Sequence, residues 1–92
     1  MTASTLRVLK IVNEKGLHAR ASAKLVEVVE AHDATATVAR DGLDASGDSI
    51  MGLLMLAASK GTSIEVRTEG PDAERLADAL EALVADRFGE EM

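Results

Sequence analysis

The sequence predicts an α+β fold, an open-faced two-layer sandwich. Apolar periodicity marks elements in the order β-α-β-β-α-β-α, and an Asp41-Gly42 pair joins two of the strands as a hairpin. The apolar stripes of the helices need one sheet face to bury against. We therefore expect a four-stranded antiparallel sheet covered on one face by three helices. Residues 1–92 would form a single domain with flexible ends at about residues 1–4 and 89–92.

The first half of the chain begins with a strand, a loop and a helix. Residues 6–12 are rich in β-branched and aliphatic side chains, which is typical of a strand, and the polar residues 13–16 indicate a loop. From residue 19 to about residue 31, apolar side chains recur at helical spacing, among them Leu25 and Val29. These positions give the first helix one face to bury.

Two short strands and a second helix follow. Residues 35–40 and 43–46 flank the hairpin turn and read as its strands. The apolar run 50–58 predicts a helix, and either Asp48 or Ser49 is suited to be its N-cap. This part of the chain therefore supplies the middle of the sandwich.

The last strand and helix are the most regular elements. Residues 63–68 alternate apolar and polar side chains, as a half-buried strand does. Pro71 favours the start of a helix at that point. The apolar stripe of this helix comprises Ala73, Leu76, Ala77, Leu80, Leu83, Val84 and Phe88.

Composition disfavours several classes of function. The chain has no cysteine, which excludes disulfides and thiol chemistry, and its two histidines make a zinc site and any other metal or cofactor unexpected. A net charge of −6 and a single aromatic residue argue against nucleic-acid binding. The longest apolar stretch, residues 53–58, is too short to cross a membrane. Without a visible secretory signal, we expect a cytoplasmic protein.

The candidate site lies in the run Gly-Leu-His-Ala-Arg at residues 16–20, just before the first helix. No Ser, Asp or Asn stands at the helix start, so we expect the amides of Ala19 and Arg20 to be free for an anion. Arg20 adds charge-assisted hydrogen bonds to phosphate, and His18 can carry a phosphoryl group. Gly16 lets the backbone turn. The spacing predicts a phosphoryl-carrying histidine.

A plainer interpretation is also open, because a histidine at a helix start is commonly a solvated surface residue. We expect His32, near the other end of the same helix, to be structural or exposed, since a cation there complements the helix dipole. The two histidines are too far apart to share a metal ion.

The chain resembles HPr, the histidine phosphocarrier family of bacterial phosphotransferase systems. Residues 16–20 resemble its phosphorylation-site motif, and residues 47–56 resemble the segment around its regulatory serine. Residues 60–62 also fit, and the resemblance extends from Leu6 to Phe88. The second segment and residues 64–71 look most like the nitrogen-type branch, called NPr.

The resemblance implies a stoichiometric phosphoryl carrier rather than an enzyme. His18 would accept a phosphoryl group on Nδ1 from phosphorylated enzyme I, which phosphoenolpyruvate charges, and pass it to a histidine of an enzyme IIA. Arg20 would stabilise the phosphoryl charge, and a cradle of Gly16, Ala19 and Arg20 would hold the group. Ala21 stands where the family usually has proline, which leaves an additional backbone donor in this turn. A monomer is the simplest expectation.

The same resemblance assigns regulation and docking to the second helix. Ser49 matches the family's regulatory serine, a substrate of HPr kinase/phosphorylase in some bacteria, although a plain N-cap is the alternative. The apolar side chains after it are too numerous for one buried face of a short helix, so we expect some on an exposed partner surface rather than all in the core. The predicted docking residues are Ala23, Lys24, Ile50, Met51, Leu54 and Met55.

A second function remains open from the sequence. The chain could be a regulatory binding module, switched by phosphorylation of His18 or Ser49 without passing the group on. The final acceptor, in sugar uptake or in nitrogen-type regulation, is open as well. A ligand or metal carrier is disfavoured because the chain lacks clustered ligands.

Overall fold

The computed structural model describes residues 3–91, and the flexible ends expected at residues 1–2 and 92 lie outside this range. Within residues 3–91 the chain forms four strands, three α-helices and a final 3₁₀ turn. In order these are β1 (Ala3–Lys10), α1 (Ala19–Glu30), β2 (Thr35–Arg40), β3 (Leu43–Ser46), α2 (Ile50–Met55), β4 (Ser63–Gly70), α3 (Ala73–Ala85) and η1 (Arg87–Gly89).

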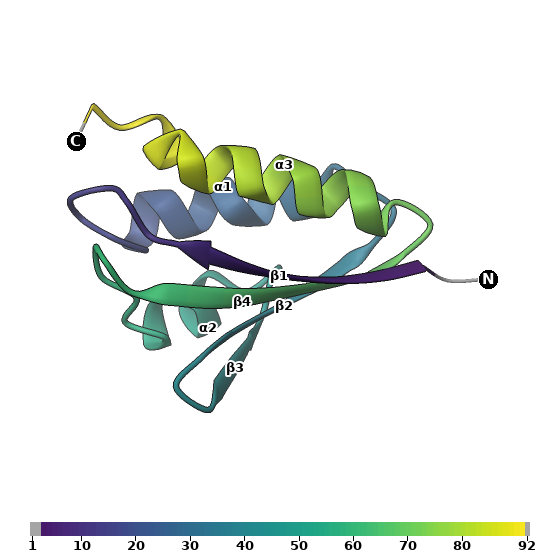
Figure 1. Cartoon of the computed structure of the whole chain (residues 1–92), viewed down its shortest axis with the longest axis horizontal. Coiled ribbons are helices and arrows are strands. Elements are labelled where there is room, and N and C mark those ends of the chain that lie inside the picture. The colour runs from purple at the N-terminus through teal and green to yellow at the C-terminus, as the bar shows by residue number, and fades with distance from the viewer. Residues whose placement is uncertain (1–2, 92) are drawn as a thin grey trace.

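The strands form one antiparallel sheet in the order β1-β4-β2-β3. Helices α1 and α3 lie side by side over one face of the sheet, and α2 contacts β3 and α1 (Figure 1). This arrangement confirms the predicted open-faced α+β sandwich. None of the helices within residues 3–91 is long and apolar enough to cross a membrane.

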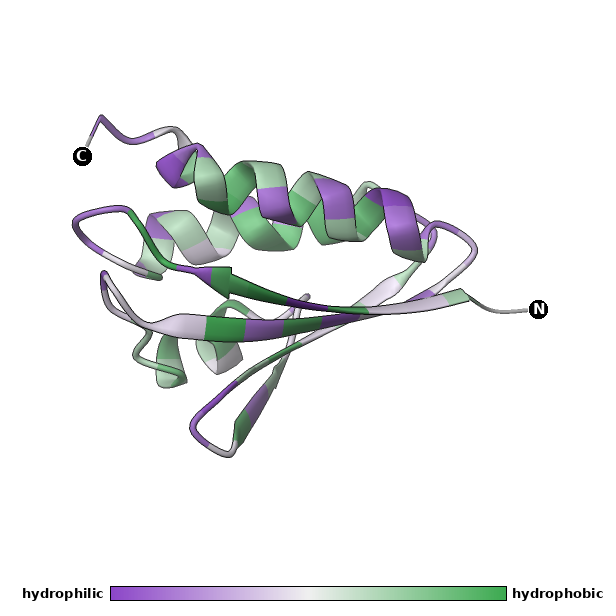
Figure 2. Cartoon of the chain, viewed as in Figure 1, coloured by the Kyte–Doolittle hydropathy of each residue, from purple (hydrophilic) through white to green (hydrophobic). Residues whose placement is uncertain are grey.

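The alternation of side chains along the strands separates a buried face from an open one. On β4, Ile64 and Val66 are fully buried while Glu65 is exposed, and Figure 2 shows the same alternation of colour along the strand. Leu6 and Val8 of β1 lie on the open face, where 56% and 65% of their surfaces are exposed. The core is therefore made between the sheet and the helices.

The second helix is shorter than the apolar run 50–58 predicts. It ends at Met55, and Ala57 adopts a left-handed conformation with φ +50°. This turn brings the carbonyl oxygen of Ala58 to the backbone N–H of Leu17 at 2.9 Å. A long-range hydrogen bond to the loop before α1 thus replaces the last helical turn.

Boundaries of other elements differ from the prediction as well. The first strand covers residues 3–10 rather than 6–12, because it pairs with β4 as far as Gly70. The last helix begins after Asp72 rather than at Pro71, and the Asp72 carboxylate accepts a hydrogen bond from the Asp33 N–H at 2.8 Å instead of capping the helix. Phe88 lies beyond α3, in the 3₁₀ turn.

Candidate functional site

His18 is itself the N-cap of α1, which differs from the expectation that no capping side chain is present. Its backbone is extended, with φ −77° and ψ −177°, and its Nδ1 accepts a hydrogen bond from the Arg20 N–H at 3.3 Å. That distance is long for an N–H donor, so the bond is weak. The Arg20 amide is therefore lightly engaged rather than free, and Nδ1 is the ring nitrogen that faces the helix start.

The start of α1 offers further donors to an anion. Within residues 3–91, the backbone N–H groups of Ala19 and Ala21 have no hydrogen-bond acceptor, and the exposed Arg20 guanidinium has no ion-pair partner. A helix N-terminus carries partial positive charge in addition. The amides of Ala19 and Ala21 and the Arg20 guanidinium are therefore available to an anion without loss of a protein contact.

Gly16 has a different role from the cradle position that the motif predicts. It is buried, its N–H donates to the Asn13 carbonyl oxygen at 3.2 Å, and its own carbonyl oxygen accepts from Asn13 Nδ2 at 2.8 Å. With φ +66°, a Cβ there would overlap the Ala58 carbonyl oxygen. The N–H and the carbonyl oxygen of Gly16 are therefore both bonded within the loop, and neither is free for a ligand.

The sequence does not predict two residues of this site, Glu90 and Asn13. The Glu90 carboxylate bonds His18 Nε2 through Oε2 and accepts from Asn13 Nδ2 at 2.9 Å through Oε1. The hydrogen bond from Asn13 lowers the pKa of Glu90 below its ordinary value, and the hydrogen bond from His18 lowers it further. A hydrophilic loop residue and an acidic tail gave no signal of this contact, because Glu90 lies 72 positions from His18.

The C-terminal tail also differs from the frayed end that its acidic composition predicts. Residues 87–89 form a 3₁₀ turn, and Lys24 Nζ donates to the Phe88 carbonyl oxygen at 2.6 Å. Lys24, one of the predicted docking residues, is half-buried and holds the tail. Its neighbour Ala23 is half-buried as well.

The predicted docking residues of α2 divide between surface and core. Met51 and Met55 are 71% and 75% exposed, and Ile50 is 39% exposed, whereas Leu54 is half-buried. Leu53 between them is fully buried and anchors the helix. The exposed apolar patch therefore consists of Ile50, Met51 and Met55.

Ser49 caps α2, and its Oγ accepts from the Gly52 N–H at 3.0 Å. The side chain is half-buried, and a Cβ on Gly52 would lie 3.1 Å from this oxygen. Glycine at that position thus leaves room beside the hydroxyl.

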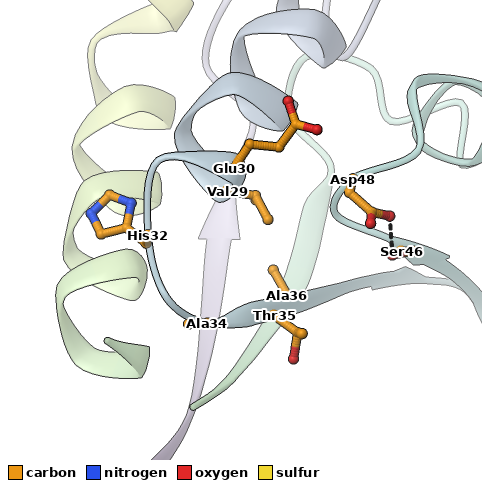
Figure 3. A pocket seen from close by; sticks show the side chains of 8 residues that line it. All are labelled: Val29, Glu30, His32, Ala34, Thr35, Ala36, Ser46 and Asp48. Atoms are coloured by element: carbon orange, nitrogen blue, oxygen red, sulfur yellow. Dashed lines mark hydrogen bonds between the residues drawn. The ribbon is translucent and has the colours of Figure 1, made fainter. Parts of the chain in front are cut away.

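A separate pocket of about 160 Å³ lies at the far end of α1. Figure 3 shows the His32 ring on one side of it and Asp48, hydrogen-bonded to Ser46 at 2.5 Å, on the other. The Nδ1 of His32 bonds the Val28 carbonyl oxygen at 2.8 Å, so the ring caps the last turn of α1. In the described part of the chain, no group of three or more acidic or histidine side chains could hold a metal ion.

The sequence that carries this site, a histidine N-cap beside unpaired amides and an arginine, matches the model of a known family. The family model "PTS HPr component phosphorylation site", where PTS denotes the phosphotransferase system, matches residues 6–86. The chain belongs to the HPr family. Members of the HPr family are phosphocarriers, so the resemblance seen in the sequence is confirmed.

Relatives carry both names used within the HPr family. The phosphocarrier protein HPr of Cupriavidus necator is 46% identical over 80 residues, which cover 87% of this chain and 90% of the relative. The phosphocarrier protein NPr of Shewanella violacea is 40% identical over 84 residues, covering 91% and 92%. Assignment to the nitrogen-type branch therefore stays a prediction.

Solved HPr structures share the fold. The crystal structure of HPr-C-His from Thermoanaerobacter tengcongensis superposes with a TM-score of 0.90 at 33% identity, covering 96% of this chain and 99% of that chain. The HPr of Bacillus anthracis superposes with a TM-score of 0.84 at 34% identity, covering 89% and 98%.

Proposed function

We propose that this protein accepts a phosphoryl group on Nδ1 of His18 from phosphorylated enzyme I and passes it to a histidine of an enzyme IIA, in the cytoplasm. The observation that carries the proposal is the orientation of the His18 ring. Its Nδ1 faces the start of α1, where a phosphoryl group meets backbone donors and the positive end of the helix.

The weak hydrogen bond between the Arg20 N–H and Nδ1 suits a site that alternately binds and releases a phosphoryl group. When Nδ1 becomes bonded to phosphorus, the Arg20 N–H can turn to a phosphoryl oxygen, and the unpaired Ala19 N–H can donate to another. The Arg20 guanidinium adds positive charge from the exposed side. Ala21 contributes a further N–H at the position where the family usually has proline. The charge of the transferring group is thus met by fixed donors.

We assign the docking of both enzyme I and enzyme IIA to the exposed patch of Ile50, Met51 and Met55. This apolar surface lies on a helix that contacts α1, and the loop after it is hydrogen-bonded to Leu17, next to His18. Flexible methionine side chains suit a surface that must fit more than one partner. The patch therefore supports successive binding of a donor and an acceptor.

Reconstitution with enzyme I and phosphoenolpyruvate tests the carrier function. We expect intact-mass spectrometry to find one acid-labile phosphoryl group on the wild-type protein, and phosphorus NMR to place it on an imidazole nitrogen. Omitting enzyme I is the control and should leave the protein unmodified. An unmodified protein in the complete mixture would contradict the proposal.

Addition of purified enzyme IIA proteins separates the carrier from a regulatory module. A carrier loses its phosphoryl group when its acceptor is added, and the acceptor gains the same mass. If the group stays on His18 with every enzyme IIA of the source organism, onward transfer is wrong and the regulatory function is the better one.

A charge at Ser49 should slow uptake of the phosphoryl group. Ser49→Asp places a carboxylate next to the exposed patch, and we expect charging by enzyme I to slow by about three- to tenfold, since a charge at the rim of an interface acts on the association rate. Ser49→Ala is the matched control, because it loses the cap at a cost of about 1 kcal/mol but adds no charge. Equal rates for both variants in a rapid-quench assay would refute electrostatic regulation at Ser49.

A further inference from the structure

The C-terminal segment, residues 87–91, returns to the phosphoryl site after the last helix. Figure 1 shows it in yellow, passing above the loop between β1 and α1. From this segment Glu90 reaches His18 Nε2 on the side of the ring opposite Nδ1. The side chain of Glu90 is only 15% exposed, so this contact is enclosed by the protein rather than made loosely in solvent.

The segment reaches this place through an unfavourable backbone. Arg87 and Phe88 both have left-handed φ angles, 57° and 54°, which residues with a Cβ rarely adopt. The Phe88 side chain is fully buried, and its carbonyl oxygen is held by Lys24. Gly89 completes the turn with φ +79°. Burial of Phe88 thus maintains a conformation whose effect is to direct Glu90 to the site.

Asn13 holds the carboxylate from the other side. Asn13 is completely buried, and its two Nδ2 hydrogens go to Glu90 Oε1 and to the Gly16 carbonyl oxygen. Its Oδ1 has no hydrogen-bond partner within residues 3–91, so the two donated bonds orient the amide. The same side chain therefore ties Glu90 to the loop that carries His18.

We propose that Glu90 is a positioning residue that holds the proton of His18 on Nε2 and leaves Nδ1 as the nucleophile. The proposal rests on the phosphocarrier function. An ionised carboxylate can only accept hydrogen bonds, so its ring partner Nε2 must donate. Asn13 and His18 lower the pKa of Glu90, which keeps the group ionised at neutral pH. The remaining lone pair of the ring then lies on Nδ1, at the start of α1.

The transfer step balances with this arrangement. The Nδ1 lone pair forms a bond to phosphorus as the bond from phosphorus to the donor histidine breaks, and the donor nitrogen keeps that electron pair. The Nε2 proton stays in place, so the His18 ring gains positive charge while the group is bound. The Glu90 carboxylate faces that charge and stabilises it, and no proton has to leave the site. This is the role that an orienting carboxylate has beside a reactive imidazole.

Nitrogen-15 NMR of the imidazole ring tests the positioning directly. On wild-type protein at a pH where the ring is neutral, we expect a protonated Nε2 and an unprotonated Nδ1. Glu90→Gln removes the charge, so we expect a mixture of the two ring tautomers. We also expect phosphoryl uptake to be about tenfold slower, which is the factor that corresponds to a lost interaction of one pKa unit. Glu91→Gln is the matched control, since it removes the same charge from an exposed neighbour and should behave as wild type.

Three outcomes would overturn the proposal: a protonated Nδ1 in the wild type, wild-type ring shifts in Glu90→Gln, or equal slowing in the Glu90 and Glu91 variants. The ring spectrum needs no phosphoryl donor. It therefore tests Glu90 even if the protein takes up no phosphoryl group, and that failure would count against the proposed function instead.

Discussion

Phosphoryl uptake should be abolished in His18→Ala, with no phosphorylated species detectable after incubation with enzyme I and phosphoenolpyruvate. The substitution removes the only imidazole at the start of α1 within residues 3–91 and therefore the nucleophile itself. Arg20 and the helix amides remain, but they can only bind the group. Intact-mass spectrometry at neutral pH measures the result, since a phosphohistidine is lost in acid.

His32→Ala is the matched control for this prediction. The 12-residue helix α1 separates the two histidines by about 18 Å along its axis. The His32 ring bonds the Val28 carbonyl oxygen and lies beside the pocket of Figure 3, away from the phosphoryl site. We expect this variant to be charged as fast as the wild type. A labelled His18→Ala protein, or an unlabelled His32→Ala protein, would contradict the assignment of the nucleophile.

Loss of folding would not explain an inactive His18→Ala protein. Removal of an N-cap costs about 0.5–2 kcal/mol, and the capping bond here is long. Stability of a domain of this size is about 5–15 kcal/mol. The variant should therefore keep the circular dichroism spectrum of the wild type at 25 °C, and the lost uptake can be attributed to the missing ring.

Local signals account for the parts of this protein that could be predicted. The apolar spacing through Leu25 and Val29 defines α1, and Asp41-Gly42 defines the β2–β3 hairpin. His18 and Arg20 stand two residues apart at a helix start, so a site built from them is visible in the sequence. Each of these features depends on residues within a few positions of one another.

Contacts between distant segments account for what could not be predicted. The end of α2 depends on the bond from Leu17 to the Ala58 carbonyl oxygen, and no pattern within residues 50–58 records it. The hydrogen bond that Glu90 accepts from His18 is a stronger case, because an acidic residue near a chain end ordinarily indicates a solvated tail. The bond from Asn13 Nδ2 to Glu90 is a further case, since nothing in the sequence around a loop asparagine indicates a partner 77 positions away.

Gly16→Ala should produce the largest loss of stability among single-methyl substitutions in the site. A left-handed conformation costs a residue with a Cβ about 1–2 kcal/mol. Gly16 has φ +66°, and its added methyl group would overlap the Ala58 carbonyl oxygen and lie 2.9 Å from Ser59 Cα. Both neighbours are backbone atoms, so overpacking adds about 1–3 kcal/mol. We expect a loss of about 3 kcal/mol in the free energy of unfolding, measured by urea denaturation.

Gly42→Ala isolates the close approach from the backbone conformation. Gly42 also has a positive φ, +80°, but no atom lies within 4 Å of a Cβ built there. Gly42→Ala should therefore lower the free energy of unfolding by only about 1–2 kcal/mol.

The Gly16 substitution also pushes apart the loops that carry His18 and Ala58. The folded fraction of Gly16→Ala should therefore take up phosphoryl groups more slowly than the wild type, whereas Gly42→Ala should take them up at the wild-type rate. Equal stability losses in the two variants would mean that the packing of Gly16 against Ala58 and Ser59 does not decide where the site forms. A larger loss at Gly16, together with slower uptake, would mean that a residue without a side chain positions the nucleophile by allowing two backbones to meet behind it.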